Sequence, residues 1–353
     1  MKTSTISSMS IHNALRYTMR NSQAELIKAQ QEVSTGQYQD IGAVLGAKTT
    51  RNIDLNGEML RIENLKSTNS IVTQRLSASQ EALSAIAKSG QTILNSLVAL
   101  AQNTDASSVK TTSDTVKAAF QSITSAANTS LNGEYLFSGI NTDVKPLDDF
   151  YAPGGSTSKT AVTNALNTYL AAQTPALTSA SDMSKTQMDD FITNTLTPMF
   201  TGPAWNTTWS SATDQNMTTR VNRNEVIETS TNTNSDGMRN MALASVLTTE
   251  LLGLGLSNDV RQLVAEKATS AVGLAISGVN VQRTALGLSE SRVSNANTSL
   301  DAQKTIIETH LSDLTGVDAF EASTRVANLK ALVEAAYSMT AQLQQMSLVN
   351  FLK

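Results

Sequence analysis

The most regular hydrophobic pattern in the chain lies between positions 272 and 314. Every seventh residue there is apolar, and no proline interrupts the stretch. These residues are Val272, Val279, Leu286, Val293, Leu300, Ile307 and Leu314. A strict seven-residue spacing keeps one stripe on one side of a long helix that winds against a partner helix. The pattern therefore predicts a long helix with a continuous packing seam.

The second row of positions in this seam is mostly small or polar. It consists of Ala275, Gln282, Ser289, Ala296 and Gln303. A narrow seam with polar members favours a helix that packs against several neighbours. An ordinary amphipathic helix in a monomeric bundle would show the same periodicity, and the pattern alone does not separate the two.

The N-terminal part of the chain carries helical periodicity in three stretches. Apolar residues recur at intervals of three, four or seven over residues 5–35, 49–102 and from about 106 to 129. Gly36 is placed to end the first helix, and residues 37–46 indicate a turn or kinked connector. The stripe of the second helix includes Ile53 and Leu60, and at 1.5 Å per residue that helix would be on the order of 80 Å long.

A change of composition marks an inserted domain. All five prolines fall between residues 146 and 203, followed closely by Trp205 and Trp209. Because proline removes a backbone donor and clashes with the preceding helical turn, long helices tolerate it poorly. The stretch 143–235 is therefore predicted to be a small α/β domain, with helices over 161–172 and 185–200 and a hairpin over 218–228. The tryptophans are predicted to lie in a loop and to fill the core of this domain.

Helical patterns flank the insert on both sides. The segment 132–139 before it has two glycines around an aromatic-apolar core, which indicates a short strand or hairpin. After residue 236 a helix resumes, Gly253 and Gly255 interrupt it, and the long seam helix begins near Asn258 and ends at Gly316. A last helix over 317–351 has a stripe at alternating three- and four-residue spacing: Leu329, Leu332, Ala336, Met339, Leu343 and Met346.

These elements predict a mainly α fold, a long antiparallel helical rod with paired N- and C-terminal helices and a small inserted α/β domain. The first and last helices each expose an apolar stripe, which pairing would cover. Three domains are expected: 1–42 with 315–353 as a terminal coiled-coil assembly domain, 43–142 with 236–314 as the rod, and 143–235 as a surface-exposed variable domain. A two-helix layer buries little surface, so the terminal pair is expected to be marginally stable until assembly.

Composition excludes several classes of function. Charged residues make up 16% of the chain, the net charge is −4, and the pI is near 5.3. Nothing here favours a nucleic acid or an anionic membrane as partner. There is no cysteine, so disulfides and cysteine-ligated metals are excluded. No cleavable signal is expected in residues 1–8, and no apolar run approaches the ~18 residues of a membrane span.

Candidate chemistry is sparse. His12 and His310 have no companion ligand three or four residues away, whereas zinc needs three or four ligands. The acidic pairs 148–149 and 189–190 lie beside prolines or at a helix start, where solvated or first-turn charge is the simpler interpretation. The run 253–256 (Gly-Leu-Gly-Leu) lacks the third glycine and the lysine of a phosphate loop. We therefore expect no catalytic residue, no metal site and no cofactor.

Four segments resemble the flagellin family. Residues 26–36 (LIKAQQEVSTG) are similar to the family's leucine-spaced run ending in Ser-Thr-Gly. Residues 132–139 (NGEYLFSG) resemble the exit from the rod in the family's hook–filament junction branch. Leu286-Gly287 and residues 347–352 (SLVNFL) are similar to the C-terminal helices. The acidic pair and proline that often follow the glycine are replaced by Asp40 and residues 41–44 (IGAV).

The resemblance implies a non-enzymatic structural subunit of the bacterial flagellum, exported unfolded and located outside the cell at the hook–filament junction. The implied partners are further copies in a ring, the neighbouring hook-associated protein, flagellin and a cytoplasmic export chaperone. The expected assembly interface consists of Ile11, Leu15, Leu26, Val33, Leu329, Leu332, Leu343, Met346 and Leu348. A flagellin filament subunit is an alternative, and an intracellular helical adaptor or signalling module is a second one.

Overall fold

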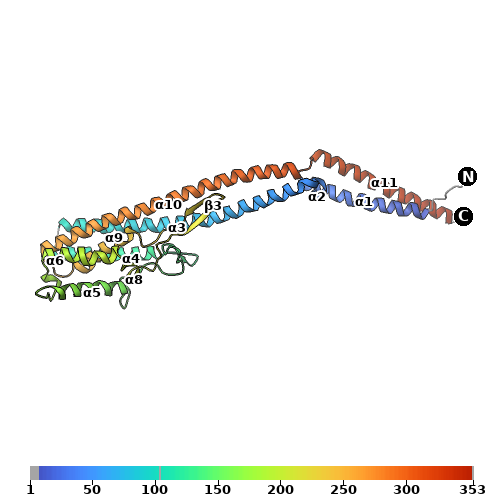
Figure 1. The fold of residues 1–353 in the computed structure, drawn as a ribbon. Helices are drawn as coiled ribbons and strands as arrows, with labels where there is room; N and C mark the ends of the chain where they lie inside the picture. Colours follow the sequence, from blue (N-terminus) through green and yellow to red (C-terminus); the bar gives the residue numbers. More distant parts are fainter. Residues whose placement is uncertain (1–7, 103–104, 352–353) are drawn as a thin grey trace. The chain divides into compact units, whose positions relative to one another are not determined.

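The chain is mainly helical in the computed structural model, which describes residues 8–102 and 105–351. Within these ranges the side chains of residues 8, 9, 11, 12, 102 and 343–351 are not described. Figure 1 shows the long helices α1 (Ser8–Thr35), α3 (Thr49–Gln102), α4 (Ala106–Ala127), α10 (Asn258–Thr315) and α11 (Ala319–Phe351). The predicted bounds of the second helix, 49–102, are confirmed, as is the long seam helix that ends at Gly316.

Shorter elements complete the described chain. Residues 36–48 hold α2 (Ile41–Leu45) and the 3-10 turn η1 (Gly46–Lys48), and a small hairpin follows α4 in strands β1 (Ser130–Leu131) and β2 (Glu134–Tyr135). The region 143–251 holds α5 (Thr157–Ala172), η2 (Ala180–Asp182), α6 (Lys185–Asp190), η3 (Phe191–Leu196), α7 (Thr197–Thr201), α8 (Trp205–Thr208), β3 (Thr218–Asn222), β4 (Glu225–Glu228), α9 (Asp236–Val246) and η4 (Leu247–Leu251). Both predicted hairpins are confirmed.

The chain divides into two compact units. One comprises residues 1–64 and 300–353, and the other comprises residues 65–299. The boundaries fall within α3 and α10. The region 143–235 lies inside the second unit, together with the helices that flank it in sequence.

The long seam helix carries the stripe that its spacing predicts. Val272, Val279, Leu286, Val293, Leu300 and Ile307 are all buried, and Leu314 is half-buried. Two polar members of the second row, Gln282 and Ser289, are also buried and bind backbone groups of residues 228–232, whereas Gln303 is exposed. Gln282 donates from Nε2 to the Asn232 carbonyl at 3.1 Å, and Ser289 donates to the Glu228 carbonyl at 2.8 Å. The polar seam therefore fixes the segment that follows the β3–β4 hairpin.

Helices α9 and α10 cross with their backbones in contact. A Cβ placed on Gly278 would lie 2.6 Å from the Gly237 Cα, and one on Gly237 would lie 2.6 Å from the Val279 nitrogen. No side chain fits at either position without a backbone shift. The crossing therefore needs glycine on both helices.

Aromatic stacking forms the core of the inserted region. The rings of Trp205 and Trp209 are parallel with centroids 5.6 Å apart, and Phe150 stacks on the other face of Trp209 at 5.2 Å. Phe120, from α4, contacts the same cluster. The prediction that both tryptophans fill a core is confirmed. The prediction of a loop there was wrong, because residues 205–208 form the helical turn α8 and so place both rings on one side.

A buried polar segment, residues 229–234, connects this core to α9. Asn234 accepts a hydrogen bond from Trp205 Nε1 at 2.9 Å, and its amide nitrogen donates to the Ala212 carbonyl at 3.0 Å. Arg239, from the first turns of α9, donates to the Asn234 carbonyl at 2.6 Å and to the Phe200 carbonyl at 3.0 Å. The inserted region is thus held to α9 by hydrogen bonds to buried groups, each of which would be costly to leave unpaired.

Two predicted helical patterns were wrong in detail. The helix expected over 185–200 contains a π-helical stretch, η3, which ends just before Pro198. Proline has no N–H to continue the ordinary ladder, and the Thr197 N–H bonds to the Ile192 carbonyl five residues back. Ile53 and Leu60, expected in the stripe of α3, are exposed in the first unit.

The close crossing of α9 and α10 generates a stability prediction. Gly278→Ala should destabilise the protein by about 1–3 kcal/mol, because the new methyl group must push two helix backbones apart. Gly273→Ala on the same helix is the matched control, since nothing lies within 4 Å of its added Cβ. That variant should gain about 0.5–1 kcal/mol from helix propensity. Urea unfolding of the full chain measures both, and equal changes in the two variants would contradict the close crossing.

Candidate assembly surface

Helices α1 and α11 pack against each other in the first unit. Their buried or half-buried positions alternate at four and three residues, as in a coiled coil. On α1 these are Leu15, Met19, Ser22, Leu26 and Ala29, and on α11 they are Ala322, Val326, Leu329, Val333, Ala336 and Thr340. The predicted pairing of the first and last helices is confirmed.

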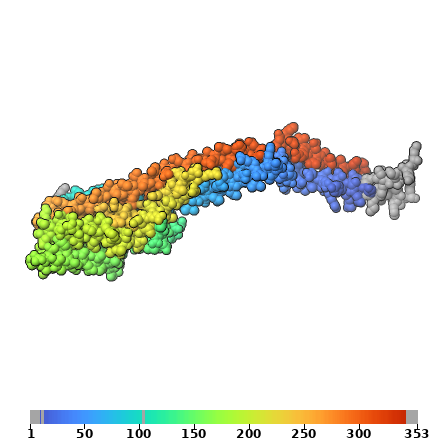
Figure 2. Space-filling model, in the orientation of Figure 1, coloured from blue at the N-terminus to red at the C-terminus, as the bar shows by residue number. Residues whose placement is uncertain are grey.

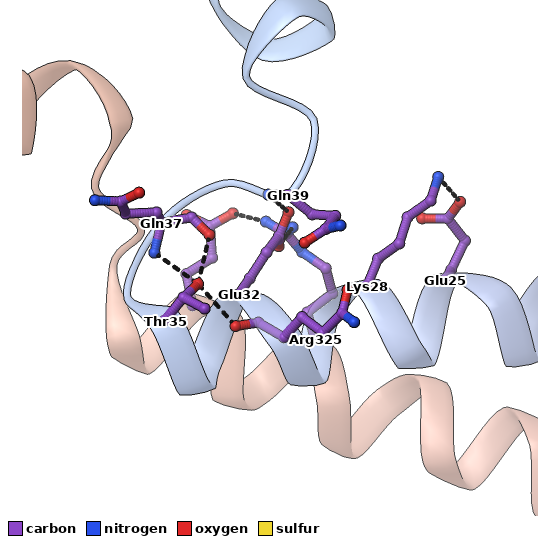
Figure 3. A network of polar contacts seen from close by, with 9 residues as sticks. Glu25, Lys28, Glu32, Thr35, Gln37, Gln39 and Arg325 are labelled. Carbon is purple, nitrogen blue, oxygen red and sulfur yellow. Dashed lines mark hydrogen bonds and ion pairs between the residues drawn. The ribbon is translucent and has the colours of Figure 1, made fainter. Parts of the chain in front are cut away.

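A buried carboxylate ties this helix pair to the connector that follows α1. Glu32 is only 7% exposed, and its Oε2 accepts from Arg325 Nη1 of α11 at 3.0 Å. Its Oε1 accepts from the backbone N–H of Gln39 at 3.2 Å. Figure 3 shows Glu32 between these two partners. Arg325 also binds Glu321 on its own helix at 3.0 Å, so its guanidinium is held on both sides.

The backbones of the two chain segments are joined at the same place. Residues 36–38 and 315–317 are linked by an antiparallel bridge between Gln37 and Gly316, by the Tyr38 N–H to the Thr315 carbonyl at 3.0 Å, and by the Val317 N–H to the Gly36 carbonyl at 2.9 Å. Gly36 has a φ of +69°, which favours glycine. Asp40 then starts α2 by accepting from the Ala43 N–H at 3.0 Å. The joint is therefore a defined structure built from both ends of the chain.

The first unit holds two further long-range polar ties. The Gln23 amide donates to the Tyr337 hydroxyl at 2.6 Å, between α1 and α11. Lys304 binds Glu63 at 3.1 Å, between α10 and α3. The hydrogen bond to the Glu63 carboxylate raises the pKa of the Lys304 ammonium group.

Large apolar side chains remain exposed on the outside of the helix pair. They are Tyr17, Ile27 and Val33 on α1, and Phe320, Leu332, Tyr337 and Met339 on α11. Phe320 is the extreme case, with 83% of its surface exposed. Single exposed apolar residues are common, but seven large ones on one pair of helices leave much apolar surface uncovered. We call this set the outer apolar face.

The expected interface residues fall into three groups. Leu15, Leu26 and Leu329 are half-buried in the α1–α11 seam, whereas Val33 and Leu332 belong to the outer apolar face. The side chains of Ile11, Leu343, Met346 and Leu348 lie outside the described residues.

The predicted stripe of α11 was wrong at Leu332 and Met339, which are exposed. Val326 and Val333 lie in the seam instead. The same helix carries two series of apolar residues at four- and three-residue spacing, and both series include Leu329 and Ala336. Sequence reasoning also missed Glu32 and Arg325. Their separation of 293 residues leaves no local signal in the sequence for this ion pair.

The acidic pairs have structural roles in the second unit. Asp148 accepts from the Ser158 N–H and hydroxyl at 3.1 and 2.7 Å, and so caps the start of α5. Asp189 pairs with Lys267 at 2.7 Å. Asp190 binds Asn194 and Tyr169, which lowers the pKa of the carboxyl group.

Among residues 8–102 and 105–351, no group of three or more His, Cys, Asp or Glu residues could hold a metal ion. In the same part of the chain, no helix is both long and apolar enough to cross a membrane. The run 253–256 is the turn between η4 and α10, with Leu256 buried.

Comparison with known proteins identifies the class. The model of the bacterial flagellin N-terminal helical region matches residues 6–142, and that of the C-terminal helical region matches residues 269–352. Together they cover more than half of the chain and include both terminal helices. No curated protein sequence matches the chain.

Two solved structures are similar in fold. One is described as a flagellar hook-associated protein from Vibrio parahaemolyticus, with 11% identity, a TM-score of 0.52, and coverage of 76% of this chain and 97% of that one. The other is Bacillus cereus FlgL, with 10% identity, a TM-score of 0.48, and coverage of 74% and 98%.

The chain belongs to the flagellin family. It is a structural subunit of the bacterial flagellum, an extracellular appendage built from exported proteins. Family membership does not favour the alternative of an intracellular adaptor.

The Glu32 joint generates a second prediction. Arg325→Met keeps the length of the side chain but leaves a buried carboxylate with one partner fewer, which should cost about 1–3 kcal/mol locally. Faster amide exchange in residues 32–40, read by hydrogen-exchange mass spectrometry, measures this. Lys28→Met removes the same charge from an exposed pair with Glu25 and should change local stability by less than about 0.5 kcal/mol. Equal exchange in the two variants would show that the joint does not depend on Glu32.

Proposed function

We propose that this subunit joins the flagellar hook to the filament. In this role, copies of the chain form a ring between the neighbouring hook-associated protein and the first flagellin subunits. The subunit has no catalytic role. The outer apolar face of the terminal helices is the observation that carries the proposal. In a single chain, α1 and α11 both leave large apolar side chains exposed, and contacts with neighbouring subunits would cover them.

The terminal helices supply the contacts between subunits. The interface comprises Ile11, Leu15, Leu26 and Val33 at one end of the chain and Leu329, Leu332, Leu343, Met346 and Leu348 at the other. Exposure of Val33 and Leu332 supports a role between chains. The seam residues Leu15, Leu26 and Leu329 are only half-covered by the partner helix and retain surface for a neighbour. Residues 1–42 and 315–353 thus act as the assembly domain, residues 43–142 and 236–314 as the rod, and residues 143–235 as the outer, variable part.

A cytoplasmic export chaperone is the expected partner before assembly. An apolar helix such as α11 would self-associate in the cytoplasm, so a chaperone that covers it until export fits its chemistry. The ring follows from the tubular geometry of hook and filament. Apolar side-chain contacts tolerate small shifts, since they lack the directional geometry of hydrogen bonds, and this would let the ring join two tubes of different curvature.

The filament itself is the second candidate location. The matching models describe flagellin helical regions, which a filament subunit would carry in the same way. The segment 132–139 and the moderate length of 353 residues favour the junction.

Gold-antibody labelling of intact cells and sheared appendages separates these locations. We expect a single cluster of label where the hook ends. Label along the whole filament would make the chain a filament subunit, and label confined to the cell interior would overturn the assembly role. Deletion of the gene, with hooks examined in the same images, should leave hooks without filaments.

The outer apolar face is tested by a matched pair of variants on α11. Leu332→Gln should reduce the chain recovered in appendages at least about tenfold, because burying a leucine contributes ~1.5–3 kcal/mol and each 1.4 kcal/mol is tenfold in binding. Lys330→Gln changes a more exposed residue two positions away and should assemble normally. Quantitative blotting of sheared appendages and of whole cells gives the ratio. Normal assembly of Leu332→Gln would remove this residue from the interface.

A further inference from the structure

The chain contains the tetrapeptide Leu-Asn-Gly-Glu twice, and the structure folds the two copies differently. One copy is residues 55–58, inside helix α3, and the other is residues 131–134, at the β1–β2 hairpin. Asparagine is a thermally labile residue, and an Asn-Gly pair is prone to lose ammonia because glycine has no side chain to shield its backbone nitrogen. The two copies therefore share the same intrinsic chemistry, and their folded surroundings set them apart.

In the hairpin copy, the reacting groups are open to solvent. Asn132 and Gly133 are the two turn residues between β1 and β2, because Leu131 pairs with Glu134. Both turn residues are exposed and have positive φ, +54° and +87°, as in the tight hairpin turns that favour Asn-Gly. Neither the Asn132 side chain nor the Gly133 N–H makes a hydrogen bond to any residue that the structure describes.

The hairpin that carries this turn is small and lies at the surface. Strands β1 and β2 have two residues each, so little has to be broken for the turn to open locally. Figure 2 shows the turquoise-green stretch around residue 130 at the surface of the second unit. The turn is therefore free to reach the conformations that a reaction between its two residues requires.

In the helix copy, the same groups are already bound. The Asn56 side-chain amide donates to the Asn52 carbonyl and to Asn52 Oδ1, both at 2.8 Å. The Gly57 N–H lies inside α3, where the helical ladder bonds it to the carbonyl four residues back. A reaction between this nitrogen and the Asn56 side chain would require the helix to open first.

We infer that Asn132 is a site of spontaneous deamidation and that the helix protects Asn56 from the same reaction. The Gly133 nitrogen loses its proton and attacks the side-chain carbonyl carbon of Asn132, Cγ. A bond forms between that nitrogen and Cγ, the bond from Cγ to Nδ2 breaks, and the amide nitrogen leaves with the proton as ammonia. Water then opens the resulting cyclic imide at either of its two carbonyls, which gives aspartate or isoaspartate at position 132.

Isoaspartate would lengthen the backbone of the turn by one methylene group, and this affects a buried contact. Arg75 of α3, which is 8% exposed, donates to Glu134 Oε2 at 2.7 Å and to the Tyr135 carbonyl at 3.1 Å. Both acceptors directly follow the turn. The longer backbone displaces them from the guanidinium group, so the reaction releases the hairpin from α3.

The location of the protein gives the reaction time to accumulate. The subunit is exported into the extracellular flagellum, where synthesis does not replace it in position. The fraction of chains changed at position 132 should therefore rise with the age of the appendage. This inference is independent of the place that the subunit takes along the flagellum.

Peptide mapping of the incubated full-length protein tests the inference. Folded protein and protein unfolded in guanidinium chloride are kept at mildly alkaline pH, where the attacking nitrogen loses its proton more readily. Mass spectrometry then follows asparagine, aspartate and isoaspartate at positions 56 and 132. In the folded protein, position 132 should convert at least about tenfold faster, because opening an interior helical turn costs more than the ~1.4 kcal/mol of a tenfold rate difference. In the unfolded chain the two rates should become similar.

Asn132→Gly is the matched variant for this experiment. A Gly-Gly turn accepts the same positive φ but has no side-chain carbonyl for the nitrogen to attack, so this variant should show no conversion at position 132. Equal conversion at positions 56 and 132 of the folded wild-type protein, or no conversion at position 132, would overturn the inference. A difference that persists undiminished in the unfolded chain would overturn its structural explanation.

Hydrogen-exchange mass spectrometry measures the consequence for the hairpin. Residues 130–137 of the incubated wild-type protein should exchange faster than those of fresh protein, because the contacts with Arg75 are lost. The same incubation should leave exchange in Asn132→Gly unchanged. Unchanged exchange in wild-type protein that contains isoaspartate at position 132 would overturn the proposed release of the hairpin.

Discussion

The structure depends on the buried seven-residue stripe of α10. The stripe supplies apolar anchors from Val272 to Val293 in one compact unit and continues through Leu300 and Ile307 in the other. Its polar companions Gln282 and Ser289 would be costly to bury alone, and they bind the backbone carbonyls of Asn232, just after the β3–β4 hairpin, and of Glu228, at its end. One helix therefore provides apolar packing energy and also selects, by hydrogen bonds, which segment packs on it.

Polar contacts specify the structure inside the subunit, while α1 and α11 also expose large apolar side chains. Glu32 and Arg325 fix the joint at the C-terminal end of α1, and Asn234 and Arg239 fix the inserted region to α9. Hydrogen bonds of this kind depend steeply on geometry and so define one arrangement. Apart from Tyr337, whose hydroxyl accepts from Gln23, the side chains of the outer apolar face are purely apolar or make no such hydrogen bond, which suits contacts that form only after export.

The boundaries of the long helices could be predicted because local signals suffice for them. Proline is absent from all of these helices, Gly36 and Gly316 follow the ends of α1 and α10, and Asn103-Thr104-Asp105 follows α3. Apolar spacing also persists over many turns, so the bounds of α3 and α10 follow from the chain itself. Candidate interface residues could be predicted only as members of stripes. Residues 329 and 336 fit two alternations of α11 equally well, and the choice between Leu332 and Val333 depends on which one faces α1. The loop predicted around Trp205 failed for the same kind of reason, since Trp205 stacks on Trp209 and Trp209 stacks on Phe150, which is far away in sequence.

The sequence by itself determined the helices, the pairing of the two chain ends and the presence of a core around Trp205 and Trp209. Each of these follows from spacing or composition within a few tens of residues. Only the tertiary structure decided that Glu32 meets Arg325, that Gly237 and Gly278 bring two helix backbones together, and that residues 229–234 are buried polar chain. These contacts join residues from 29 to 293 positions apart, and a single sequence carries no signal for such pairs. Their energies arise from burial and precise distance, which exist only after the chain has folded.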